Sequence, residues 1–315
     1  MRTLIFYILI ANLFAGASLA KENAKVVTLE KGDLSVAVKV NGKLFTNYVY
    51  ADPKRTKPIL YPVIGPNGVP MTRRYPIEEA APGEAKDHPH HASLWYTHGE
   101  VNGISFWHVA KNTGEIVHEK FLKLEDNLIS TRNKWIGPKG KIICRDERTL
   151  TFSAEGADRA IDISIKLIAD NGDVVFGDTK EGSMGIRSNP VLRLKGEVAK
   201  GKAINNEGIG GKAIWGKRAA WVSYWAPFEG GVTGFSIFDH PANLRHPTWW
   251  HARDYGLVAA NPFGIHNFER KPKGTGDLKI LDGSDITFRY RFLFHEGDAK
   301  AAKIAERYGK WSQKK

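Results

Sequence analysis

The chain has 315 residues, a formal net charge of +12 and a single cysteine, Cys144. One cysteine excludes an internal disulfide, so the folded chain must be held together by packing, with Cys144 buried as a small apolar side chain. The lysines and arginines are spread along the sequence without a dense basic run, which argues against a nucleic-acid partner and leaves an anionic polymer or cell-surface partner open.

The first twenty residues have the three parts of a secretory signal peptide. Arg2 is followed by the short apolar run LIFYILIANLFAG and by the small residues Ser18 and Ala20. We expect cleavage after Ala20 and export to the periplasm or the cell exterior. The alternative is a retained membrane anchor, but a bilayer span needs roughly 20 apolar residues and this run is shorter. Residues 21–315 are then expected to form one domain, and we find no later segment that is apolar enough to span a membrane.

The rest of the chain is predicted to be mainly β. Segments rich in Val, Ile, Thr and aromatic residues, with apolar and polar residues alternating, predict strands over residues 25–50, 148–154, 161–169, 173–178, 219–226, 231–239 and 285–297. The NG, DG and GG turns between strands are typical of antiparallel sheets. Residues 297–313 predict a short C-terminal helix that caps a sheet, and residues 61–76 and 205–218 predict long loops. The fold class is therefore a large antiparallel β-sandwich.

Residues 87–107, DHPHHASLWYTHGEVNGISFW, hold four of the eleven histidines among tryptophans and carboxylates. Histidine can serve as a general acid, a general base or a metal ligand near neutral pH. In an extended strand His88 and His90 share one face and His91 the other, so at most two of these three are expected to reach one site. The alternative is that the imidazoles are hydrogen-bonded packing residues.

Residues 238–256, FDHPANLRHPTWWHARDYG, form a second cluster of this kind. Indoles beside Arg and Asp side chains suit stacking on sugar rings and binding of hydroxyl groups, so the composition is typical of a carbohydrate site. The alternative is a buried tryptophan pair with structural ion pairs. A third candidate is Arg187, which follows a Gly-rich turn and can point at an anionic group of a ligand or be a solvated charge.

Several phrases together resemble a known family: DHPHHASLWYTHGEVNGISFW, GSMGIRSNP, IFDHPANLRHPTWWHARDYGLVAANPFG and RYRFLFHEG. They are similar to the exported bacterial family DUF6807, also labelled PmoA-like or "methane oxygenase PmoA". The resemblance implies a carbohydrate context and a sandwich like that of galactose mutarotases. It also leads us to expect an Arg after the HPHH run, where this chain has Ala92. The oxygenase label fits poorly, because a membrane-embedded oxygenase subunit needs spans that this sequence lacks.

Three functions follow as hypotheses: an exported carbohydrate-active enzyme of hydrolase, lyase or epimerase type, a non-catalytic carbohydrate-binding envelope protein, and a metal-dependent oxygenase. For the enzyme, the candidate catalytic residues are His88, His91, His98, Glu100 and His251. The candidate substrate-binding residues are Trp95, Arg187, His246, Trp249, Trp250, Arg253 and Asp254. No cofactor is firmly predicted; a divalent metal on His88, His90, His91 and His98 is an open alternative, although their spacing is diagnostic of no particular metal. The expected ligand is a carbohydrate or glycoside, and no oligomeric state is predicted.

Overall fold

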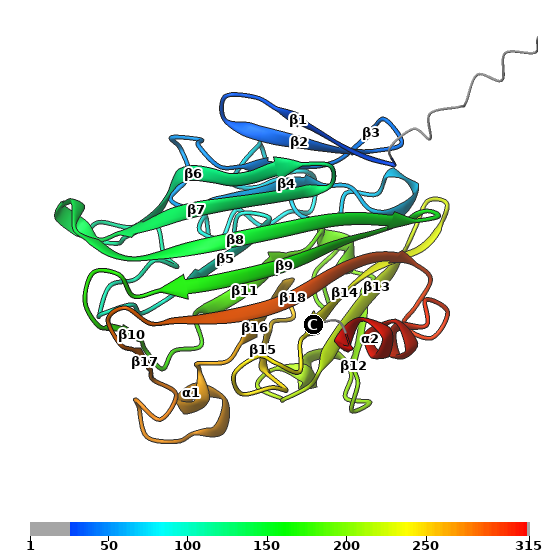
Figure 1. The fold of residues 1–315 in the computed structure, drawn as a ribbon. Coiled ribbons are helices and arrows are strands. Elements are labelled where there is room, and N and C mark those ends of the chain that lie inside the picture. The colour runs from blue at the N-terminus through cyan, green and yellow to red at the C-terminus, as the bar shows by residue number, and fades with distance from the viewer. Residues whose placement is uncertain (1–25, 314–315) are drawn as a thin grey trace, which may run out of the picture.

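Strands form in every segment where the sequence predicts them, and most of the strands assemble into two large antiparallel sheets (Figure 1). The computed structural model describes residues 26–313, so the predicted signal peptide lies outside the described residues. The first sheet consists, in spatial order, of β1 Val27–Lys31, β2 Ser35–Val40, β3 Lys43–Val49, β4 Ile59–Val63, β5 Leu94–His98, β11 Gly182–Arg187, β16 Leu257–Asn261 and β15 Trp249–Ala252. The second consists of β12 Lys202–Asn205, β13 Trp221–Phe228, β14 Gly231–Asp239, β18 Asp285–Glu296, β9 Asp158–Ile168, β8 Ile142–Glu155, β7 Leu128–Ile136 and β6 Glu115–Glu125. A separate pair joins β10 Val174–Phe176 to β17 Leu278–Ile280.

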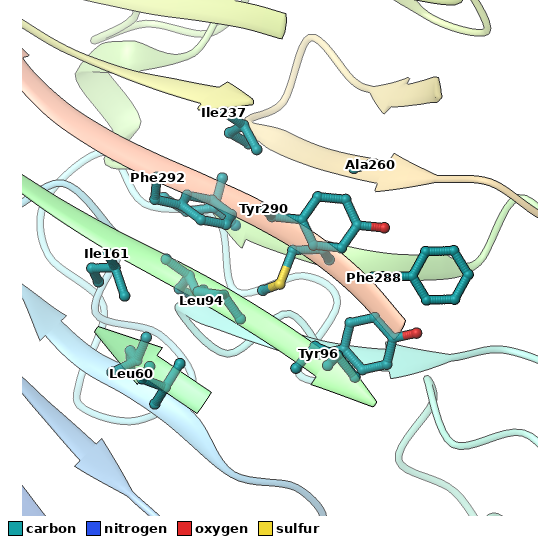
Figure 2. Packing of buried hydrophobic residues seen from close by; sticks show 14 of the residues in the cluster. Leu60, Leu94, Tyr96, Ile161, Ile237, Ala260, Phe288, Tyr290 and Phe292 are labelled. Atoms are coloured by element: carbon teal, nitrogen blue, oxygen red, sulfur yellow. The ribbon is translucent and has the colours of Figure 1, made fainter. Parts of the chain in front are cut away.

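The alternation of side chains along each strand creates one core between the two sheets. Figure 2 shows Leu94 and Tyr96 of β5 among Ile161 of β9 and Tyr290 and Phe292 of β18, all of them buried. Each large apolar side chain that is fully buried contributes about 1.5–3 kcal/mol. Cys144 is also buried here as an unpaired thiol, as predicted. The mainly β sandwich is therefore confirmed.

The predicted C-terminal helix is present as α2, Ile304–Ser312, and it covers part of the outward face of the second sheet. Its buried residues Ile304 and Trp311 pack against Phe238 and Leu293. The only other α-helix in the described part of the chain is α1, Ile265–Glu269, which follows β16. Neither helix is long and apolar enough to cross a bilayer.

The outward face of the first sheet carries a second, smaller apolar cluster. Trp95 and Ala259 of the sheet pack there with Ala92 and Trp107, which lie on the connections that precede and follow β5. The chain between β4 and β5 has no strand over residues 64–93. Of the loop predicted over residues 61–76, the first three residues belong to β4 and the others lie in this connection. These two connections bring the first histidine-rich segment onto this face.

Candidate functional site

The floor of the candidate site is one row of residues that crosses four strands of the first sheet. The strand register pairs Trp95 of β5 with Gly185 of β11, Gly185 with Ala259 of β16, and Ala259 with His251 of β15. Because their neighbours along the strands face the core, these four residues face outward. A Cβ added at Gly185 would lie 3.1 Å from Cζ2 of Trp95, so the glycine lets the indole extend over the neighbouring strand. Two small residues therefore separate the Trp95 indole from His251.

Three buried rings pack together at one end of this row. The His91 ring lies 5.5 Å from that of Trp95 and nearly parallel to it, at 15°. Trp107 meets the rings of Trp95 and His91 edge-on, with both centroid distances at 5.4 Å. His91 Nε2 and the indole nitrogens of Trp95 and Trp107 have no hydrogen-bond partner within residues 26–313. This corner is consequently rich in N–H donors.

Residues 88–91 form a turn. The His91 backbone N–H donates to the His88 carbonyl at 2.9 Å, and His88 has a φ of 44°, in the left-handed region. The prediction that strand alternation separates His91 from His88 and His90 is therefore wrong, because a turn brings neighbouring side chains to one side. The ring centroids lie 4.8 Å apart for His88 and His91, 4.4 Å for His90 and His91, and 5.6 Å for His88 and His90. All three imidazoles belong to one cluster.

Asp87 is the anionic centre of this cluster, held between two arginines. Arg73 Nη1 and Arg187 Nη2 both donate to Asp87 Oδ1, at 2.7 and 2.8 Å. Arg73 Nη2 also donates to the carbonyls of Asp87 and His88, which fixes the turn. Burial raises the pKa of the Asp87 carboxyl, but Arg187 and the hydrogen bonds from Arg73 and His88 lower it more, to about 2. Asp87 is therefore ionised at neutral pH.

The hydrogen bonds of His88 and His91 determine which nitrogen of each ring carries a hydrogen. Arg187 Nη1 lies 2.9 Å from His91 Nδ1; since a guanidinium can only donate, Nδ1 accepts and the neutral His91 carries its hydrogen on Nε2. Asp87 Oδ2 lies 2.8 Å from His88 Nδ1; since a carboxylate can only accept, His88 Nδ1 donates and its Nε2 is left to accept a proton. The His88 side chain is 40% exposed, whereas His91 is 1% exposed. Of these two imidazoles, His88 is therefore the one that a ligand can reach.

The second predicted segment joins the cluster through its last residues. The Tyr255 ring lies 5.1 Å from that of His88, at 13°. The Arg187 guanidinium lies 4.6 Å from the centre of the Tyr255 ring, and that of Arg253 lies 5.6 Å from it. Residues far apart in the sequence thus meet at one place on the outward face of the first sheet.

Glu181 and His251 add a carboxylate and a neutral imidazole. Burial raises the pKa of Glu181, but His251 and the ion pair with Lys180, at 3.0 Å, hold it below its usual range. Burial lowers the pKa of His251 to about 4, despite the opposing effect of Glu181. Burial is the main cause of the pKa shifts of His90 and Tyr255, and the Glu181 carboxylate acts to raise both pKa values.

The imidazoles next to His88 are uncharged at neutral pH. Burial, and then the nearby His108 and Lys57, lower the pKa of His90 to about 3. Burial also lowers the pKa of His91 well below its ordinary value, with His90 and Arg187 as further causes. These two rings therefore act as hydrogen-bonding groups and aromatic surfaces.

The same arrangement fits a metal ion poorly. No group of three or more His, Cys, Asp or Glu side chains in the described ranges is placed to hold one. In addition, a guanidinium occupies Nδ1 of His91, and two guanidiniums surround the Asp87 carboxylate. Their positive charge opposes a cation at the predicted ligands.

Comparison with known proteins identifies the family. Residues 35–309 match the model described as "Family of unknown function (DUF6807)". The chain belongs to this family. Its description names no activity and does not include the PmoA label, and no curated protein matches the sequence.

Several solved structures are distantly similar to this DUF6807 protein. A galactose mutarotase related enzyme from Lactobacillus acidophilus has 9% identity and a TM-score of 0.34, over 86% of this chain and 97% of that one. The galactosidase domain of an alpha-galactosidase-sucrose kinase has 9% identity and a TM-score of 0.41, over 87% of this chain and 42% of that one. A putative kojibiose phosphorylase from the human microbiome has 9% identity and a TM-score of 0.33, over 64% of this chain and only 25% of its own. At TM-scores below 0.5, these likenesses indicate no shared ligand or activity.

Two candidates from the first segment of the DUF6807 chain lie away from this cluster. His98 is fully buried, with its ring against Phe176 and Phe263 and Nε2 at 2.8 Å from the Gly177 carbonyl. Burial lowers its pKa to about 4. Glu100 lies beside Gly177, and one of its carboxylate oxygens is 3.7 Å from Lys273 Nζ.

Two candidates from the second segment, His246 and Trp250, also lie elsewhere. His246 Nδ1 is 2.7 Å from Asp239 Oδ2, and its Nε2 is 3.5 Å from the Tyr308 hydroxyl of α2. Trp250 is fully buried in the core between the sheets.

The remaining two candidates from this segment, Trp249 and Asp254, have contacts outside the cluster. The Trp249 ring is covered by Arg218 at 4.5 Å, and its Nε1 donates to Glu269 at 3.0 Å. The Asp254 carbonyl accepts hydrogen bonds from the backbone of Leu194 and Lys195.

The cluster also contains residues that were not among the predicted catalytic or substrate-binding residues. These residues are Arg73, Asp87, Glu181, His108 and Tyr255. Tyr255 and Asp87 lie inside the two predicted segments, so the composition of those segments could have identified them as site residues. Arg73 and Glu181 come from separate connections, and no local pattern links either to the histidines.

Proposed function

We propose that this DUF6807 protein is an exported carbohydrate-active enzyme that moves protons at a sugar bound against the outward face of the first sheet. His88 Nε2 is the group that takes and returns the proton. The observation that carries the proposal is the contact between Asp87 Oδ2 and His88 Nδ1 at 2.8 Å in a half-exposed position. An ionised carboxylate on one ring nitrogen orients the imidazole and stabilises its cationic form while the other nitrogen acts.

Each neighbouring residue has a definite part in this step. His88 Nε2 removes a proton from a sugar hydroxyl, or from a carbon next to a carbonyl or carboxyl group, and becomes an imidazolium paired with Asp87. The same nitrogen then returns the proton to the departing oxygen or to the product. Arg73 and Arg187 hold Asp87 in place, so they are positioning residues. Hydrolysis, elimination and epimerisation all contain such a transfer.

The surroundings of His88 support a sugar as the ligand. Tyr255 offers an aromatic ring, Arg253 offers a donor fork 5.6 Å from its centre, and Glu181 offers an acceptor whose charge acts on Tyr255. Sugars present apolar C–H faces and hydroxyl groups that both donate and accept, so they are bound by this mixture of side chains. Trp95 lies beneath His91 and is 1% exposed, so Tyr255 replaces it as the stacking surface in this proposal.

A non-catalytic carbohydrate-binding protein is the second candidate. The neutral state of His90 and His251 favours it, because uncharged imidazoles can bind hydroxyl groups without moving protons. The two candidates differ in what His88 contributes. An enzyme needs it for turnover, whereas a binding protein needs only its ring surface.

Turnover by the His88→Asn variant distinguishes these candidates. The purified protein and the variant are incubated with a panel of neutral and acidic glycosides, and products are detected by mass spectrometry. We expect turnover with the unmodified protein and a loss of about 10²- to 10⁴-fold in the variant, with sugar binding retained. Binding without turnover by the unmodified protein across the panel supports the binding protein and contradicts the enzyme.

A further inference from the structure

A cavity of about 190 Å³ opens beside the histidine cluster, between the chain that precedes β4 and the 88–91 turn. Its walls include Arg55, Lys57 and Ile59 on one side and Pro89, His90 and Ala92 on the other. Since a water molecule takes up roughly 30 Å³, this volume corresponds to about six waters, enough for an acidic group and part of a sugar ring. Three larger hollows, of about 220, 330 and 360 Å³, lie at other places and include none of the clustered rings.

Lys57 is the unusual residue of this cavity. Lys57 is 4% exposed, and no carboxylate pairs with it among the residues that the structure describes. Its one hydrogen bond there is a long one, 3.4 Å from Nζ to the Trp107 carbonyl. A buried ammonium group has three donors and is costly to leave without an anion. Burial, and then Arg55 and Arg148, lower the pKa of Lys57 to about 7, as expected for a cation without a counter-ion.

The other polar groups around the cavity do not supply the missing negative charge. Arg55 and Lys54 add two further cations, and no acidic side chain belongs to the lining formed by the described chain. Arg55 itself reaches Asp52 only at 3.5 Å and the Pro76 carbonyl at 3.4 Å. Arg55 Nε is also without a hydrogen-bond partner among the described residues, so the charged side chains of the lining offer donors and no acceptor.

His90 connects this cavity to the proton-transfer site. Its side chain belongs to the lining, and its ring lies 5.6 Å from His88 and 4.4 Å from His91. A sugar ring at His88 can therefore extend a substituent past His90 toward Lys57.

We propose that this cavity binds the acidic substituent of the substrate, so that the enzyme acts on an acidic sugar whose carboxylate or sulfate group pairs with Lys57. The inference rests on the proposed function for its sugar ligand, but it concerns binding and does not depend on which reaction follows. The anion supplies the acceptors that the lining lacks and neutralises the one buried ammonium group beside the cluster.

The test is equilibrium binding by calorimetry, with glucuronic and galacturonic acid as ligands and their methyl esters as uncharged controls of nearly equal shape. We expect the unmodified protein to bind at least one acid about 10- to 100-fold more tightly than its ester, because a hydrogen bond to a charged group is worth more than one to a neutral group. Sugars carrying a sulfate group, compared with their unsulfated forms, distinguish sulfate from carboxylate. Equal affinity for charged and uncharged partners in both pairs overturns the inference without any need for a variant.

Two lysine variants locate the effect. Lys57→Met is expected to remove the preference for the charged ligand, whereas Lys43→Met, at an exposed position outside the cavity, is expected to keep it. A preference that survives in Lys57→Met, or inorganic sulfate binding as tightly as the sugar acid, contradicts the inference. Because this test measures binding alone, an unmodified protein that prefers acidic sugars but does not turn them over contradicts the proposed reaction and leaves the acidic-sugar inference intact.

Discussion

The two segments rich in histidine and tryptophan have similar compositions but contribute differently to the structure. The first segment presents most of its rings on the outward face of the first sheet, where His88 and His91 stack at 4.8 Å. Most of the second segment serves packing: Trp250 lies in the core, and His246 pairs with Asp239. Only its last residues reach the cluster, through Tyr255. Composition identifies side chains capable of chemistry, but the face of the strand or turn determines which of them can act together.

The largest expected change in the free energy of unfolding is for a residue of the second segment that has a packing role. Trp250→Ala removes a fully buried indole, so we expect the free energy of unfolding to fall by about 3–5 kcal/mol in urea denaturation. His88→Asn, in the first segment, is expected to change it by less than about 1 kcal/mol, because the side chain is half-exposed. Equal losses in the two variants would remove the contrast between the segments.

The next prediction concerns His98, the histidine of the first segment that faces the core. Its folded pKa of about 4 lies below the unfolded value of about 6.5, so the unfolded chain binds more protons between these values. The stabilisation is complete above pH 6.5 and is lost as the pH falls toward 4. Relative to His98→Gln, the unmodified protein is expected to lose about 2 kcal/mol more between pH 7 and pH 5. Identical pH dependence of the two proteins contradicts a buried neutral His98.

A smaller effect is expected at the floor of the site. Gly185→Ala places a methyl group 3.1 Å from Trp95, so the indole and the rings above it must shift, at a cost of about 1–3 kcal/mol. The near-ultraviolet circular dichroism of the tryptophans is expected to change with it. Gly32→Ala is the control, since the nearest atom to its added Cβ is 3.4 Å away. An unchanged spectrum and stability in Gly185→Ala contradict the placement of Trp95 over β11.

The smallest effect is expected at the edge where the second segment joins the cluster. Arg253→Met removes a guanidinium from the Tyr255 ring, and a half-exposed contact of this kind is worth about 0.5–1 kcal/mol. Thermal unfolding is expected to show a loss of this size. A loss above about 2 kcal/mol contradicts a role at the ligand surface and indicates a packing role, like that of Trp250.

Much of the fold could be predicted because the period of two in the strands is a local signal. The seven predicted strand segments follow from it, and the C-terminal helix follows from another local signal, its content of helix-forming residues. The site was harder to predict, because its geometry depends on a turn and on strand register. Nothing around His88 signals a left-handed turn, and the pairing of Gly185 with both Trp95 and Ala259 is a property of the assembled sheet. Arg73 and Glu181 reach the cluster from connections that carry no histidine pattern.

The central claim is that Asp87 and Arg187 fix His88 and His91 in opposite tautomers, which leaves His88 Nε2 free to move a proton. Nitrogen-15 NMR of the histidine rings, assigned with His88→Asn and His91→Asn variants, tests it most directly. We expect the neutral His88 ring to carry its hydrogen on Nδ1, and His91 to remain neutral with its hydrogen on Nε2. A hydrogen on Nδ1 of His91, or a neutral His88 with its hydrogen on Nε2, would contradict the account.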